Sequence, residues 1–184
     1  MKATRTALPD VFLLEPKIFG DERGFFLESY SERVFQDLGL PTRFVQDNHS
    51  KSIRGVLRGL HYQLGTPQGK LMRVLQGEIY DVAVDMRRSS PTFGRYVGEI
   101  LDSENRRMLW IPPGFAHGFL VLSETAEVAY KASEFYAPAQ ERSLLWNDAD
   151  VAIEWPLHLI GAAGPILSTK DEAGSALAAA DSFE

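Results

Sequence analysis

Apolar and polar positions alternate along many short stretches of the chain. The clearest stretch is residues 79–86, where Tyr80, Val82, Val84 and Met86 occupy every second position. A period of two is typical of a strand with one buried face. Comparable patterns predict further strands at residues 11–14, 25–28, 56–62, 71–75, 96–101, 107–111, 118–122, 127–131 and 143–146.

Turn-forming residues separate these stretches at short intervals, as in the Pro-Pro-Gly sequence at residues 112–114. A single short helix is predicted at residues 32–38, with Ser31 as its N-cap and Gly39 at its end. Long βαβ crossovers and a Gly-x-Gly-x-x-Gly sequence are absent, which argues against a Rossmann fold. The pattern predicts an all-β sandwich or barrel, with the jelly roll as one option.

The domain organisation follows from the length of 184 residues and from the absence of an internal repeat or a break in composition. We expect one domain spanning residues 1–184, with a core at about 11–148 and a C-terminal segment, residues 149–184, packed on it. From about residue 173 onward the chain is mostly Ala, Gly, Ser and acidic residues. That composition predicts a poorly ordered tail.

Composition narrows the chemistry that is open to the chain. There are no cysteines, which excludes disulfides, thiolate zinc sites, thiol nucleophiles and iron–sulfur clusters. The net charge of −6 and the lack of a basic tail argue against a nucleic-acid partner. The apolar runs are too short to span a membrane, and the first ten residues lack the apolar core of a signal peptide. We expect a cytoplasmic protein without a membrane partner.

His61 is the first candidate for chemistry, because two arginines and two glycines precede it within seven residues. A lone histidine in a strand is more often structural, but glycine permits a bulge or the close approach of a ligand. Strict alternation places Arg58 and His61 on opposite faces, since their spacing is odd. If both line one pocket, a bulge near Gly59 must shift the register.

Two segments resemble the cupin motifs. Gly55-x5-His61-x-Gln63 is similar to the first motif, Gly-x5-His-x-His followed by Glu, and Pro112-x-Gly114-x2-His117 is similar to part of the second. Gln63 stands in place of the second histidine, and Pro and Gln occupy positions 67 and 68, where the Glu is expected. Two imidazoles are too few for a stable divalent metal site. The resemblance implies a cupin-like jelly roll, a double-stranded β-helix with a few short peripheral helices, that holds no metal and no cofactor.

A longer series of motifs narrows the resemblance. The motifs, in chain order, are residues 21–26 (Asp-Glu-Arg-Gly-Phe-Phe), 46–50 (Gln-Asp-Asn-His-Ser), 57–61 (Leu-Arg-Gly-Leu-His), 68–70 (Gln-Gly-Lys), 110–118, 130–131 and 147–148. From about residue 11 to residue 171 the chain resembles the dTDP-4-dehydrorhamnose 3,5-epimerase family. The resemblance implies an isomerase of dTDP-L-rhamnose biosynthesis that epimerises C3 and C5 of dTDP-4-dehydro-6-deoxy-D-glucose to give dTDP-4-dehydro-L-rhamnose.

The family match also assigns roles to residues. It implies that His61 is the base, Asp171 its dyad carboxylate, Tyr130 the proton donor and Lys70 the cation at the enolate oxygen. From sequence alone Asp171 is a solvated tail residue, Lys70 a surface lysine and Tyr130 an ordinary strand aromatic. The substrate-binding residues implied by the match are Arg23, Glu28, Gln46, Asp47, Asn48, Arg58, Lys70, His117, Tyr136 (stacked on thymine), Glu141 and Lys170. The alternation of its neighbours, however, suggests that Asp47 faces away.

Three other functions stay open at this point. Relatives on dTDP-4-ketosugars epimerise a single carbon or act as ketoisomerases, and the chain can also be a non-catalytic sugar- or nucleotide-binding cupin. A metal-dependent cupin oxygenase is the last alternative. The resemblance further implies a homodimer in which the strand at residues 11–14 is exchanged, so that the following segment with Arg23 reaches the partner's pocket.

Overall fold

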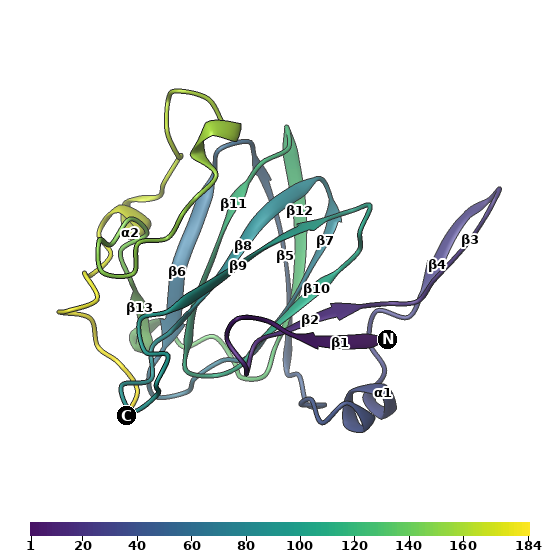
Figure 1. Ribbon diagram of the computed structural model, residues 1–184, viewed down its shortest axis with the longest axis horizontal. Coiled ribbons are helices and arrows are strands. Elements are labelled where there is room, and N and C mark those ends of the chain that lie inside the picture. The colour runs from purple at the N-terminus through teal and green to yellow at the C-terminus, as the bar shows by residue number, and fades with distance from the viewer.

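Two antiparallel sheets form the body of the molecule in the computed structural model, which describes residues 1–184 (Figure 1). The six-stranded sheet has the order β1-β2-β10-β7-β12-β5, the five-stranded sheet has the order β13-β6-β11-β8-β9, and β3 and β4 form a separate hairpin. The strands are β1 (Lys2–Arg5), β2 (Phe12–Glu15), β3 (Ile18–Asp21), β4 (Gly24–Leu27), β5 (Gln46–Ile53), β6 (Leu57–Gln63), β7 (Lys70–Gln76), β8 (Glu78–Asp85), β9 (Tyr96–Asp102), β10 (Met108–Ile111), β11 (Phe115–Val121), β12 (Thr125–Ala132) and β13 (Glu141–Ser143).

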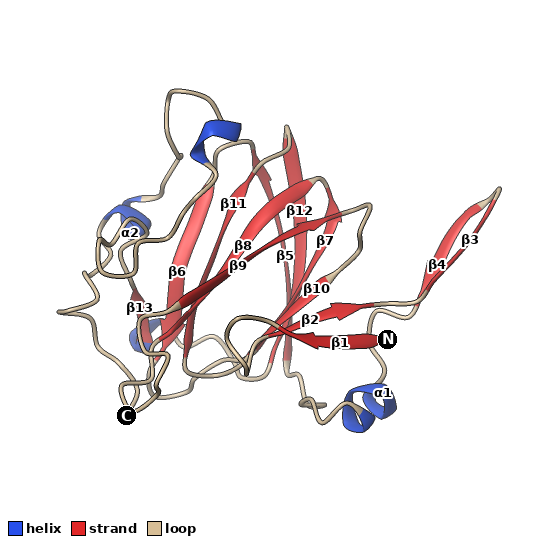
Figure 2. Cartoon of the chain, viewed as in Figure 1, coloured by secondary structure: helices blue, strands red, loops and turns tan.

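The eight central strands have the connectivity of a jelly roll. The order β5-β12-β7-β10 lies in one sheet and β6-β11-β8-β9 in the other, so the chain crosses repeatedly between the two sheets. The helices α1 (Glu32–Asp37) and α2 (Thr169–Glu172), with short 3₁₀ turns at Pro138–Gln140 and Leu157–Leu159, lie at the periphery (Figure 2). The predicted all-β class is therefore confirmed. No helix is long and apolar enough to cross a membrane.

Apolar side chains fill the space between the sheets over part of its length. Met72 of β7, Ile79 of β8 and Leu109 of β10 are completely buried there. A second cluster covers the outer face of the five-stranded sheet, where Trp155 and Ala180 of the C-terminal segment pack on the strands. Polar side chains replace the apolar ones at the remaining end of the barrel, and that end forms the site.

The C-terminal tail, which the sequence predicts to be poorly ordered, makes defined contacts with the body of the molecule. Ala180 is 4% exposed, and the backbone N–H of Phe183 donates to the carbonyl of Met86 at 2.9 Å. Asp181 accepts a hydrogen bond from the Tyr62 hydroxyl through its backbone and another from Arg142 through its carboxylate. A few anchoring residues hold a segment whose average composition is that of a linker.

The strand that sequence reasoning missed most clearly is β5. Its sequence, Gln-Asp-Asn-His-Ser-Lys-Ser-Ile, has almost no apolar residue, although it pairs with β12 over its full length. One face of β5 is turned toward a polar cavity and the other is exposed, so neither face requires apolar side chains. The strands β1 and β3 were also not predicted.

The N-terminal strand β2 pairs with two strands of its own chain, β1 on one side and β10 on the other. The exchange of this strand between two copies of the chain stays a prediction. The β3–β4 hairpin, in contrast, projects from the body (Figure 1). Phe25 and Phe26 on this hairpin are 57% and 69% exposed.

Candidate active site

A cavity of about 490 Å³ opens at the polar end of the barrel. Strands β5, β6, β7, β11 and β12 and the C-terminal segment all contribute side chains to its wall. The cavity brings together most of the residues that the sequence singled out: Gln46, Asn48, Arg58, His61, Lys70, His117, Tyr130, Tyr136, Glu141, Lys170 and Asp171. His49, Ser50, Gln68, Phe119 and Ser168, which were not predicted, also line it.

The predicted bulge in β6 is confirmed. In the pairing of β6 with β11, His61 lies opposite residue 117, whereas Arg58 lies opposite residue 119. An advance of three residues along β6 thus pairs with an advance of two along β11, which is a β-bulge. As a result, the side chains of Arg58 and His61 both face the cavity. Gly59 has φ +120°, and a Cβ on it would lie 2.5 Å from the Cα of Gly118. Two facing glycines therefore permit the bulge; the Gly59–Leu60 peptide bond is cis.

His61 and Asp171 form a close pair at the inner end of the cavity. The distance from His61 Nε2 to Asp171 Oδ1 is 2.6 Å, and the Asp171 residue is 3% exposed. Asp171 also accepts from the Ser168 hydroxyl at 2.7 Å and from the Gly59 N–H at 3.2 Å. Burial would raise the pKa of Asp171, but the hydrogen bonds from His61 and Ser168 outweigh it and lower the pKa to about 2. The carboxylate is therefore charged and fixes the orientation of the imidazole.

Lys70 begins β7 beside this pair and is 8% exposed. Its Nζ donates to the backbone carbonyl of His61 at 3.3 Å, and no carboxylate lies within salt-bridge distance. Burial lowers the pKa of Lys70 to about 8, although Glu141 and Asp81 oppose the shift. A compact cation with free donors thus faces the cavity.

His117 is held from behind by Asp81, a residue that the sequence analysis did not select. The distance from His117 Nε2 to Asp81 Oδ1 is 2.7 Å, and Asp81 is fully buried. Burial lowers the pKa of His117, and the nearby Asp81 only partly compensates. An aspartate within an apolar strand is a signal that could have identified this position, since a buried carboxylate requires a partner.

Two tyrosines extend over the cavity from different elements. Tyr130 points inward from β12, and both burial and the nearby Glu141 raise its pKa. Tyr136 lies at the mouth, is 50% exposed, and donates its hydroxyl to Glu141 at 2.9 Å. Glu141 also binds Lys170 at 2.8 Å. The ring of Tyr136 is therefore accessible at the mouth of the cavity, and the hydrogen bond from its hydroxyl to Glu141 fixes its position.

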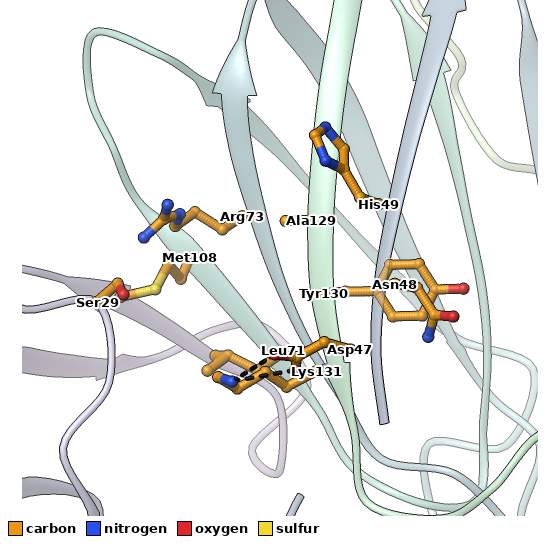
Figure 3. A pocket seen from close by; sticks show the side chains of 10 residues that line it. All are labelled: Ser29, Asp47, Asn48, His49, Leu71, Arg73, Met108, Ala129, Tyr130 and Lys131. Atoms are coloured by element: carbon orange, nitrogen blue, oxygen red, sulfur yellow. Dashed lines mark hydrogen bonds and ion pairs between the residues drawn. The ribbon is translucent and has the colours of Figure 1, made fainter. Parts of the chain in front are cut away.

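The assignment of Asp47 to this cavity was wrong. Its carboxylate binds Lys131 at 3.0 Å on the outer face of the six-stranded sheet, beside a second cavity of about 320 Å³. Figure 3 shows Asp47 and Lys131 on one side of the strands, and Tyr130 and Asn48 pointing to the other. Successive strand residues face opposite sides, so Asp47 cannot share the face used by its neighbours.

Arg23 and Glu28 also lie outside the cavity of their own chain. Arg23 is at the tip of the β3–β4 hairpin, where its exposed side chain pairs with Asp21. Glu28 directly follows β4 and is exposed. The predicted contact of these two residues with substrate is therefore not formed within one chain.

The cupin ligand positions have other partners here. His61 and His117 each bind a buried aspartate, and Gln63 binds backbone groups. The structure contains no group of three or more histidine, cysteine or acidic side chains that could hold a metal ion.

Comparison with known proteins identifies the family to which the chain belongs. The model of the dTDP-4-dehydrorhamnose 3,5-epimerase family matches residues 5–179. The chain belongs to this family. A dTDP-4-dehydrorhamnose 3,5-epimerase from Pseudomonas aeruginosa is 60% identical over 100% of the chain and 99% of that protein. The epimerase-family fold, the cupin-like jelly roll, is thereby confirmed, and the chain is an isomerase.

Solved structures of family members agree. A dTDP-6-deoxy-D-glucose-3,5-epimerase from Legionella pneumophila, crystallised with dTDP-4-keto-L-rhamnose, has a TM-score of 0.93 and 51% identity, covering 98% of this chain and 94% of its own. A 3′-monoepimerase from Streptomyces bikiniensis, in complex with dTDP-quinovose, has a TM-score of 0.85 and 34% identity, covering 95% and 87%. The fold is thus shared with a single-carbon epimerase, to which the chain is less similar in sequence.

Proposed function

We propose that the chain epimerises both C3 and C5 of dTDP-4-dehydro-6-deoxy-D-glucose, giving dTDP-4-dehydro-L-rhamnose. The observation that carries the proposal is that the His61–Asp171 pair, Lys70 and Tyr130 all face one cavity. The 60% identity with an epimerase of this specificity, against 34% with the monoepimerase, supports the choice of two carbons.

Proton abstraction falls to His61. The C4 ketone of the sugar acidifies the C–H bonds at C3 and C5, so a base at each carbon in turn generates an enolate. An imidazole suits this step because one ring nitrogen can accept the proton while the other stays bonded to a carboxylate. Asp171 stabilises the imidazolium that forms, at 2.6 Å. Lys70 places a positive charge where the enolate oxygen develops its negative charge.

Reprotonation from the opposite face falls to Tyr130. A phenol is a weak acid, but an enolate carbon is much more basic, so the transfer is favourable. The raised pKa of Tyr130 keeps the phenol protonated and ready to donate at neutral pH. Before the second carbon reacts, the imidazolium of His61 releases its proton to solvent and the phenolate of Tyr130 takes one up, which restores both groups.

The nucleotide part of the substrate lies toward the mouth. Tyr136 offers its half-exposed ring to thymine, because an aromatic face suits a flat base. Arg58 and Lys170 face the same cavity and supply cations for the diphosphate. The net charge of −6 does not prevent binding, because local cations decide the field at the site.

A second copy of the chain supplies Arg23 and Glu28 in this proposal. β5 ends the six-stranded sheet, so its outer edge has no partner, and Gln46 and Asn48 on β5 face the cavity. The projecting β3–β4 hairpin is a two-stranded unit with exposed phenylalanines that needs such an edge. Light scattering should give a dimer, and Arg23→Ala should raise KM without unfolding the protein.

Turnover in deuterated water, followed by NMR of the product, tests the proposed function. We expect deuterium at both C3 and C5, and label at one carbon would assign a monoepimerase instead. His61→Asn should abolish exchange at both carbons while the fold is retained. His158→Asn, a substitution of an exposed histidine outside the cavity, is the matched control and should be silent.

A further inference from the structure

Gln63 ends β6 and is 3% exposed, yet it does not line the cavity. It occupies the position at which the cupin motif has its second histidine. All of its amide hydrogen bonds of 3.2 Å or less go to backbone groups: Nε2 donates to the carbonyls of Thr66 at 2.8 Å and Phe135 at 3.2 Å, and Oε1 accepts from the N–H of Ala137 at 2.8 Å.

Two of these backbone groups belong to the residues on either side of Tyr136. The carbonyl of Phe135 and the N–H of Ala137 both face the same side-chain amide, so Gln63 holds the chain before and after the tyrosine. The N–H of Tyr136 itself donates to Gln46 Oε1 at 3.0 Å. The loop between β12 and β13 is exposed at Phe135 and Tyr136, and little apolar packing fixes it there.

We propose that Gln63 is a positioning residue that sets the affinity for the thymidine part of the substrate by fixing the backbone around Tyr136. This inference rests on the proposed role of Tyr136 as the platform for the base. The amide group is required, because only it combines two donors with an acceptor in the arrangement that these peptide groups demand. A carboxylate of the same shape would place an oxygen against the carbonyls of Phe135 and Thr66.

The effect should fall on binding and not on the chemical step. Gln63 makes no hydrogen bond to His61, Asp171 or Lys70, although it lies two residues after His61 on the same strand. A displaced Tyr136 weakens contact with the base equally in the ground state and the transition state. KM therefore rises while kcat changes little.

A double-mutant cycle on Gln63→Glu and Tyr136→Ala, read as the Kd for dTDP by calorimetry and as kcat and KM, tests the inference. We expect Gln63→Glu to weaken dTDP binding about tenfold and to change kcat less than about twofold. Tyr136→Ala should weaken binding at least as much. In the double variant the two effects should not multiply, because Gln63 acts through the tyrosine.

Thr66→Val is the matched control. It removes the hydrogen bond that the Thr66 hydroxyl donates to Gln140 and the long one, at 3.4 Å, that it accepts from Gln63 Nε2, but it leaves the bonds of Gln63 to residues 135 and 137 in place. We expect dTDP binding close to that of the wild type. If Gln63→Glu fails to fold, Gln63→Met, which has a similar shape and no amide, takes its place in the cycle.

The outcomes separate the inference from the proposed function. Wild-type dTDP affinity in the Gln63 variants, together with a weakened Tyr136→Ala, would overturn the inference alone. Multiplicative effects in the double variant, or a weakening by Thr66→Val as large as that by Gln63→Glu, would also overturn it. Wild-type affinity in Tyr136→Ala would remove the platform, and with it the inference, while deuterium incorporation continued to test the epimerase chemistry independently.

Discussion

At the scale of single residues, the site depends on carboxylates that are buried and still charged. Asp171 keeps its charge because three donors surround it: His61, the Ser168 hydroxyl and the Gly59 N–H. A buried carboxylate without such donors would be neutral and would not stabilise an imidazolium. Ser168 is thus part of the machinery by which the proposed base is held, although it does not touch His61.

Replacing Ser168 by Ala removes one of these donors. We expect the pKa of Asp171 to rise and kcat to fall about tenfold, because the carboxylate is held less firmly against His61. Ser168→Thr retains the hydroxyl and should retain most of the activity. The measurement is the coupled turnover assay with a reductase specific for the epimerised sugar, and equal losses in the two variants would contradict the role of the hydroxyl.

The lowered pKa of Lys70 predicts that the proposed reaction slows at alkaline pH. Its pKa is lowered to about 8, so the side chain is charged below pH 8 and becomes neutral above it. Since the proposed enolate stabilisation requires the charge, kcat/KM should decline as the pH rises through about 8. Glu141 raises the pKa of Lys70, so Glu141→Gln should move this decline to lower pH. A pH profile of kcat/KM with its alkaline limb unmoved by Glu141→Gln would assign that limb to another group.

At the scale of elements, the bulge in β6 places Arg58 and His61 on the same face of the sheet. Gly59 tolerates its φ of +120° and the close approach of β11 because it lacks a Cβ. Without the bulge, Arg58 and His61 would face opposite sides of the sheet, and the cavity would lose one of them. Local backbone geometry thus decides which side chains face the cavity.

Gly59→Ala should therefore be severe. A Cβ would lie 2.5 Å from the Cα of Gly118 and 2.7 Å from the carbonyl of His117, both of them backbone atoms. We expect the free energy of unfolding to fall by about 3 kcal/mol or more, with loss of activity. Gly161→Ala is the control, because Gly161 also has a positive φ but has no atom within 4 Å of the added carbon. Thermal denaturation of both variants provides the comparison.

The strands that could be predicted are those with an apolar face, such as β8 and β12, and the bulge at Gly59 followed from a parity conflict. β5 could not be predicted from hydrophobicity, because its inner face lines a polar cavity. The family motifs, rather than residue patterns, identified Asp171, since nothing local distinguishes it from a solvated aspartate. For Asp47 the motif was misleading. Its neighbours in the motif line the cavity, but its own side chain points to the other face because successive strand residues alternate.

At the scale of the whole molecule, the lowered pKa values of two buried aspartates make the stability of the fold depend on pH. Asp85 is fully buried; burial would raise its pKa, but hydrogen bonds from Arg87, Ser90 and Thr92 outweigh it and lower the pKa to about 2, as in Asp171. The folded-state pKa lies below the unfolded value of 3.8, so the stabilisation is present above about pH 4. It is lost as the pH falls toward 2.

Asp85→Asn should therefore destabilise the protein at neutral pH by about 2 kcal/mol, the free energy that corresponds to the shift in pKa. The difference from the wild type should narrow as the pH is lowered from about 4 to 2, because the wild type loses the same contribution. Urea denaturation at several pH values measures this. A difference that stays constant over the whole range would show that the charge of Asp85 does not supply the stabilisation.

The position of Asp171 in the chain also bears on how the molecule is made. All eight strands of the jelly roll lie before residue 133, whereas the carboxylate that holds His61 arrives about forty residues later, on a segment that folds back over β6. During synthesis from the N-terminus, the barrel strands are complete before the proposed base is paired. A nascent or prematurely ended chain would carry the strand-built wall of the cavity without the His61–Asp171 pair, so we expect proton abstraction only after the C-terminal segment has docked on β6.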